Sequence, residues 1–159
     1  MSWQYIITIF VGAILGGAIG LEREYRSKEA GFRTHFLVGL GSALFMILSV
    51  HGFDGFQGQE GVIIQRDPAR MAAQVVCGIG FIGAGTIIFQ KNVVKGLTTA
   101  AGLWVTSAIG MTAGVGMYDV AVAATVMVLV CLETMNFLHH HVFKSRKREY
   151  DVDENEQDA

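Results

Sequence analysis

A stretch dense in charges, GLEREYRSKEAGFRTH at residues 20–35, holds the first side chains that could do chemistry. Glu22 with Arg26, and Glu24 with Lys28, stand four residues apart in the order that favours ion pairs on a helix. The spacing alone fits a solvated, ion-paired turn. The density of carboxylates and guanidinium groups beside an apolar helix fits a functional site, because charged groups kept at a membrane are usually functional.

Two short polar segments are further candidates. In RDPAR, Asp67 precedes Pro68 and Arg70, which is the order of a helix N-cap followed by a first-turn proline. Asp67 and Arg70 are therefore either a capping pair or a polar site at the start of that helix. Asn92 lies in QKNVVKG, a seven-residue segment that we expect to form a turn between two antiparallel helices.

Glu133 is the acidic residue expected deepest within an apolar segment. It lies about 9 Å inside the end of the last predicted helix, at about 1.5 Å per residue. Asn136 and His140 follow on the same face. We expect this stripe to face other helices rather than lipid, and an acid in that position is a functional candidate.

The glycines in VCGIGFIGAG have the spacing G-x-G-x-x-G of a dinucleotide-binding loop. That loop needs a preceding strand and an acidic residue about 20 positions later, and neither is present. We instead expect close helix packing, which small residues permit. A second set of glycines is spaced four residues apart near the N-terminus. The predicted packing glycines are Gly12, Gly16, Gly20, Gly78, Gly80, Gly83 and Gly85.

The composition predicts that membrane helices position these candidate polar residues. The 159 residues are 52% hydrophobic and 16% charged, with 20 glycines and one proline, and the charges are segregated from long uncharged runs. Runs of about 20 apolar residues cross a bilayer as helices. The predicted fold class is therefore all-α, a compact bundle of five transmembrane helices at about 3–21, 34–53, 69–90, 97–117 and 119–139. This domain would cover residues 1–142, and residues 143–159 would be a disordered charged tail.

The positions of the basic residues predict the orientation of the bundle. Ten of the twelve Lys and Arg residues fall on one side of the five predicted spans and two on the other. Basic residues concentrate in cytoplasmic loops. We therefore expect the N-terminus outside and the C-terminus in the cytoplasm.

No pairing of Ser or Cys with His suggests catalysis. We therefore expect that the protein is not an enzyme, that it has no cofactor other than possible Mg²⁺, and that it has no nucleic-acid partner.

Three segments of the sequence resemble the motifs of the MgtC/SapB family of bacterial inner-membrane proteins. They are GLEREYRSKEAGFRTHFLVGLGSALFMILS, DPARMAAQVVCGIGFIGAGTIIF and GLTTAAGLWVTSAIGMTAG, in the family's order, and the resemblance covers about residues 12–116. It implies a five-helix domain in the inner membrane. It also implies a role in magnesium homeostasis, acid resistance or virulence, with ATP synthase and the membrane potential among the proposed targets.

The resemblance also assigns polar residues. The family's signature falls on Glu22, Arg23, Arg33 and Thr34 in the first motif, on Asp67 and Arg70 in the second, and on Asn92 before the third. The virulence branch carries a C-terminal domain that resembles an ACT domain, whereas a short charged tail follows the last predicted helix here. The chain is therefore similar to a minimal membrane-domain member of the family.

Two functions fit these residues and the family resemblance. The chain is either a regulator that binds a membrane partner, such as a transporter or ATP synthase, or a transporter or channel for Mg²⁺ or another cation. Glu22, Asp67 and Glu133 are the candidate metal ligands, because Mg²⁺ needs only one or two carboxylates besides its waters. A homo-oligomer would favour transport, since a pore could then lie between protomers. A lipid bilayer is the expected environment in either case.

Overall fold

The computed structural model describes residues 2–54, 67–90 and 93–138. The chain divides into two compact units, Met1–Thr125 and Val126–Ala159. The expected tail at 143–159 lies outside the described residues, as do Asn92 and His140.

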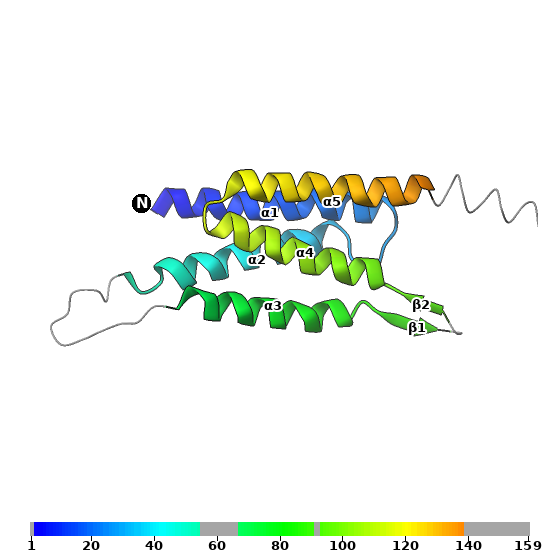
Figure 1. The fold of residues 1–159 in the computed structure, drawn as a ribbon, viewed down its shortest axis with the longest axis horizontal. Coiled ribbons are helices and arrows are strands. Elements are labelled where there is room, and N and C mark those ends of the chain that lie inside the picture. The colour runs from blue at the N-terminus through cyan, green and yellow to red at the C-terminus, as the bar shows by residue number, and fades with distance from the viewer. Residues whose placement is uncertain (1, 55–66, 91–92, 139–159) are drawn as a thin grey trace, which may run out of the picture. The chain divides into compact units, whose positions relative to one another are not determined.

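The described residues form five α-helices and one β-hairpin (Figure 1). The helices are α1 at Ser2–Tyr25, α2 at Phe32–His51, α3 at Pro68–Ala84, α4 at Leu97–Gly114 and α5 at Tyr118–Leu138. The strands are β1 at Ile88–Gln90 and β2 at Val93–Lys95. The predicted all-α class is confirmed, and each predicted span corresponds to one of these helices.

Three of the helices are long and apolar enough to cross a membrane: Trp3–Tyr25 in α1, Phe32–His51 in α2 and Tyr118–Met135 in α5. The other two helices, α3 and α4, do not meet this criterion, and the reason differs between them. The 17 residues of α3 make it shorter than the predicted 69–90. The 18 residues of α4 include Thr99, Thr106 and Ser107, which are buried among other helices rather than exposed to lipid.

The third predicted helix is wrong at its C-terminal end. It stops at Ala84, where the Thr86 hydroxyl donates to the Gly83 carbonyl, 2.8 Å away. Residues 88–95 then form an antiparallel hairpin in which Ile88 pairs with Lys95, so the expected simple turn at 90–96 is also wrong. Gly96 ends this hairpin at φ +87°, where a Cβ would overlap the Thr86 carbonyl oxygen. β-branched residues and the left-handed glycine favour this return over a longer helix.

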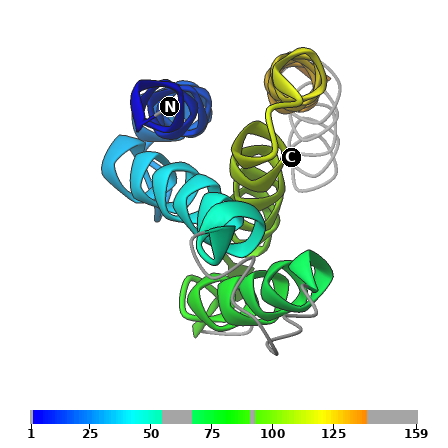
Figure 2. The same cartoon turned by 90° about the vertical axis from the view of Figure 1, so that its left-hand side faces the viewer.

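The core of the first unit is a close contact of α1, α2 and α4. A Cβ built on Gly12 would lie 2.9 Å from Ala43 Cβ and 3.0 Å from the Gly39 carbonyl oxygen. A Cβ on Gly110 would lie 2.5 Å from that same oxygen. The three backbones therefore meet at Gly39, with no room for side chains between them. Figure 2 shows α2 passing between α1 and α3, with α4 beside it.

The two predicted glycine sets behave differently. Gly16 and Gly20 continue the contact of Gly12, since a Cβ on either would lie within 2.7 Å of the α2 backbone. Gly78 and Gly80 do not pack in this way within one chain, because a Cβ on either meets nothing within 4 Å in the part that the structure describes. Both glycines are exposed, whereas α3 buries Ile79 and Gly83. Contact of Gly78 or Gly80 with another chain stays a prediction.

Candidate functional site

A buried ion pair lies at the C-terminal end of α1. Arg23 Nε and Glu22 Oε2 form its closest contact, and Arg23 Nη2 donates to Glu22 Oε1 at 2.6 Å. The side chains are only 3% and 9% exposed. Arg26 Nε adds a second, longer approach to Glu22 Oε1 at 3.7 Å, which confirms the predicted pairing of these two residues. A two-pronged contact between guanidinium and carboxylate is the strongest form of this interaction.

The start of α2 packs against the same end of α1, because Gly20 lets the two helices touch. A Cβ on Gly20 would lie 2.7 Å from Phe32 Cα and 2.9 Å from His35 Cβ. Glu24, expected to pair with Lys28, accepts a hydrogen bond from the Phe32 backbone N–H at 2.7 Å. That bond satisfies one of the free donors at the N-terminus of α2. The charged loop is therefore part of the helix packing.

His35 is a buried polar residue that sequence analysis missed. It is fully buried, and its Nδ1 lies 3.0 Å from the Gly31 carbonyl oxygen. A carbonyl can only accept, so Nδ1 donates and Nε2 of the neutral ring is left as an acceptor. Among the described residues, neither Nε2 nor the hydroxyl of the equally buried Thr106 has a hydrogen-bond partner. The sequence does contain one indication of this burial, because His35 stands at the very start of an apolar run.

His35 Nε2 lies against the part of α4 that carries Thr106. A Cβ on Gly102 would lie 3.5 Å from His35 Nε2, and Thr106 follows Gly102 by one helical turn. The next residue, Ser107, shares a buried hydrogen bond of 2.8 Å with Ser42. The inner face of α4 therefore carries polar groups beside buried apolar residues such as Leu103 and Ile109.

Thr99 ties the loop before α2 to α4. Its hydroxyl donates to Glu29 Oε2 at 2.7 Å, and Thr99 itself is 1% exposed. This hydrogen bond, helped by the nearby Lys28 and Lys95, holds the pKa of Glu29 below its ordinary value of 4.5. A lowered pKa in the folded state means that the bond stabilises the fold above pH 4.5 and that this stabilisation is lost as the pH falls through the folded pKa.

Thr99→Val is therefore expected to lower the melting temperature at pH 7 and to lower it less below pH 4. Thermal unfolding of purified protein in detergent across this range measures the difference. Thr112→Val is the matched control, because Thr112 donates to the Ala108 carbonyl of its own helix and its effect should not vary with pH. A Thr99→Val difference that stays constant from pH 7 to pH 3 would contradict the assignment.

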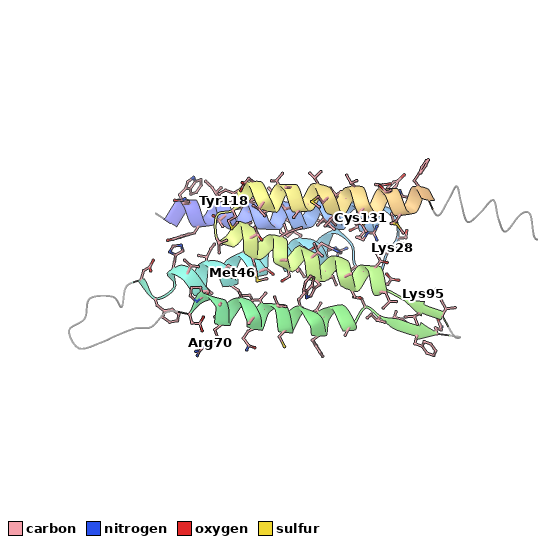
Figure 3. The ribbon with its side chains drawn as sticks, viewed as in Figure 1. Lys28, Met46, Arg70, Lys95, Tyr118 and Cys131 are labelled. Atoms are coloured by element: carbon pink, nitrogen blue, oxygen red, sulfur yellow. The ribbon has the colours of Figure 1, made fainter. Side chains whose placement is uncertain are left out.

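Asp67 and Arg70 lie at the start of α3 and confirm the predicted cap. Asp67 Oδ1 accepts from the Arg70 backbone N–H at 3.2 Å, and Pro68 occupies the first turn. Their side chains also approach to 3.5 Å, and both are well exposed. Figure 3 shows Arg70 at one end of the first unit and Lys28 and Lys95 at the other. The cap is thus remote from the Glu22 and Arg23 pair.

Two other predicted polar residues, Arg33 and Thr34, belong to a different feature of the first unit. Arg33 and Thr34 lie on the first turn of α2 and line a cavity between α2 and α3. Asn92 is outside the described residues, and Glu133 belongs to the second unit. The part of the expected cluster that the structure brings together is therefore Glu22 with Arg23.

Two of the three candidate Mg²⁺ ligands, Glu22 and Asp67, are held by arginine side chains. Both Glu22 oxygens are held by guanidinium groups, and Asp67 is held by Arg70. Within residues 2–54, 67–90 and 93–138, no three His, Cys, Asp or Glu side chains gather as a ligand set. Mg²⁺ requires near-octahedral oxygen ligands, and a neighbouring arginine repels it. The candidate ligands Glu22 and Asp67 are therefore engaged in other contacts.

Comparisons with known proteins agree with the sequence motifs. Residues 9–141 match the family described as the MgtC family. The chain is 48% identical over 150 residues to the putative magnesium transporter YhiD of Escherichia coli K12, covering 94% of this chain and 67% of that protein. It is 39% identical over 129 residues to protein MgtC of Salmonella typhimurium 14028s, covering 81% of this chain and 51% of that protein. No solved structure matches.

Proposed function

The chain belongs to the MgtC family, and from this premise we propose that it is a membrane regulator of ion homeostasis that acts by binding another membrane protein. The partner would be a cation transporter or ATP synthase, and the physiological setting would be low magnesium or acid stress. The proposed location is the bacterial inner membrane, crossed five times.

The closed core of the first unit carries this proposal. At Gly39 the backbones of α1, α2 and α4 are in direct contact, so this three-helix core has no space for a hydrated cation. The cavity of about 630 Å³ lies elsewhere, between α2 and α3, and its lining is mostly apolar. A cation crossing a membrane needs polar ligands or water along its path. Because this core offers a cation no path, we propose that the protein affects ion homeostasis by binding a partner that moves the ion.

The proposed orientation places the N-terminus outside and the C-terminus in the cytoplasm. It is supported by the ten-to-two distribution of Lys and Arg residues about the five helices. A reporter active only in the cytoplasm is expected to work when fused after Ala159 and to fail when inserted within residues 55–61. Activity of the insertion within 55–61 would reject the five-span arrangement.

Magnesium transport by an oligomer is the second candidate function. It is favoured by the exposed Gly78 and Gly80 on α3, where a second copy could approach closely, and by the name of the relative YhiD. A pathway between protomers would not need space inside the three-helix core. The two functions therefore differ in whether the chain alone moves an ion.

Inverted membrane vesicles test the regulator proposal. Vesicles from cells with and without the protein would be compared for ATP-driven proton uptake and for Mg²⁺ uptake through resident transporters. The expected result is a changed rate of one of these processes when the protein is present. Vesicles carrying Glu24→Gln protein serve as the control, because this exposed cap can still accept its hydrogen bond. Identical rates with and without the protein would reject regulation of these partners.

A further inference from the structure

The cavity between α2 and α3 has the size and lining of a ligand site. It measures about 630 Å³, within the range of roughly 300–1,000 Å³ that is typical of such sites. Its walls are mainly apolar, and they include Leu37, Val38 and Phe45 of α2 and Val75, Ile79 and Ile82 of α3. Ser42 and Ser107 also line it, but their hydroxyls are hydrogen-bonded to each other.

Two glycines keep this cavity open. Gly41 of α2 and Gly78 of α3 both line it, and a Cβ on either would meet nothing within 4 Å. The glycines at the core, in contrast, are in contact with other backbones. Gly41 and Gly78 therefore leave space that no described part of this chain fills.

The charge of the lining is confined to one end. Arg33 and Thr34 belong to the first turn of α2, whereas the far end of the cavity is lined by Phe45 and Met71. Arg33 is exposed, and no ion pair holds it in the part of the chain that the structure describes. One end of the cavity therefore attracts an anion, and the rest attracts an apolar chain.

The dimensions indicate what kind of molecule fits. Arg33 and Phe45 are separated by about 18 Å along α2, at about 1.5 Å per residue. This length is close to one leaflet, since the hydrocarbon core of a bilayer is about 30 Å thick. Dividing 630 Å³ by that length gives a mean cross-section of about 35 Å², the area of a circle roughly 7 Å across. A helix with its side chains is wider, at about 10–12 Å. The space suits an acyl chain better than a helix.

We propose that the cavity between α2 and α3 binds an anionic phospholipid, with the phosphate on Arg33 and Thr34 and one acyl chain along the cavity towards Phe45. The guanidinium of Arg33 donates charge-assisted hydrogen bonds to the phosphate, and the Thr34 hydroxyl donates one more. Basic pockets between membrane helices bind anionic headgroups in this way. The site does not depend on the regulator proposal, because it requires only that α2 and α3 lie in a bilayer.

The test is lipid retention by the purified full chain. Protein in detergent would be mixed with equal amounts of dioleoylphosphatidylglycerol and dioleoylphosphatidylcholine, and bound lipid would be counted by native mass spectrometry. The wild type is expected to prefer the phosphatidylglycerol. Arg33→Gln should reduce that preference about tenfold, which is the effect of losing one charge-assisted hydrogen bond. Binding of both lipids equally by the wild type would overturn the proposal.

Glycine variants separate the cavity from the surface. Gly78→Leu should fill the cavity and abolish retention of the phosphatidylglycerol. Gly80→Leu makes the same change at an exposed position of α3 outside the cavity lining, and lipid retention should then stay unchanged. Gly41→Leu fills the same space from α2 and replaces Gly78→Leu if that variant fails to fold. Unchanged lipid retention in a folded Gly78→Leu or Gly41→Leu variant would overturn the proposal. A smaller oligomer with unchanged lipid would assign the surface to a second copy instead.

Discussion

Replacing Gly39 by leucine is expected to prevent assembly of the first unit. A Cβ at Gly39 would overlap the Gly12 carbonyl oxygen, and a Cβ on Gly110 would in turn lie 2.5 Å from the Gly39 carbonyl oxygen. Adding side-chain atoms to a packed core costs about 1–3 kcal/mol where side chains can shift. Here the neighbours are backbone atoms of two other helices, so we expect the loss to reach or exceed the top of that range. Gel filtration in detergent would measure the fraction of monodisperse protein.

Gly80→Leu is the matched control for Gly39→Leu. A Cβ on Gly80 meets nothing within 4 Å among the described residues, and leucine forms helix more readily than glycine. This variant should therefore remain as abundant and monodisperse as the wild type. Gly39→Leu protein with wild-type abundance and an unchanged elution profile would contradict the close contact of α1, α2 and α4.

Glu22→Gln is expected to destabilise the protein more than Arg23→Met does. Loss of the Glu22 carboxylate leaves the guanidinium of Arg23 buried without an opposite charge, whereas loss of Arg23 leaves Glu22 near Arg26. Removing one partner of a buried ion pair costs about 3–5 kcal/mol. Thermal unfolding of the two purified variants in detergent compares the losses. Glu24→Gln makes the same chemical change at an exposed position and should have little effect.

A double variant then separates stability from function. Glu22→Leu combined with Arg23→Met removes both charges, and apolar replacement of a buried pair is often neutral. The double variant should therefore recover much of the abundance lost in Glu22→Gln. If the charges themselves are needed, growth in low magnesium stays defective although membrane abundance returns. Full growth support by the double variant would assign the pair a structural role alone.

The sequence predicted those features that depend on local patterns. Apolar runs predicted the helices, and the order of Asp67 and Pro68 predicted the cap that the structure confirms. The four-residue spacing of Gly12, Gly16 and Gly20 predicted close packing, because glycines spaced by one turn lie on a single helix face.

The features that sequence analysis missed depend on the partner helix. Gly39 stands in no four-residue glycine repeat, and Gly110, which lies four residues before Gly114, was not singled out. Their importance arises because they meet Gly12 in space. Gly78 has the spacing of a packing residue but lines an open cavity. The end of α3 was placed too late because the apolar residues of β1 continue the hydrophobic run, and hydrophobicity alone does not separate a helix from a strand.

Ion flux in sealed liposomes tests the central claim most directly. The purified full chain would be reconstituted into liposomes that enclose a Mg²⁺-sensitive dye, and an imposed Mg²⁺ gradient would be followed with and without a membrane potential. Since the backbones of α1, α2 and α4 meet at Gly39, the regulator proposal predicts no Mg²⁺ entry above that of protein-free liposomes. Saturable Mg²⁺ entry that depends on the wild-type protein would contradict it and establish transport.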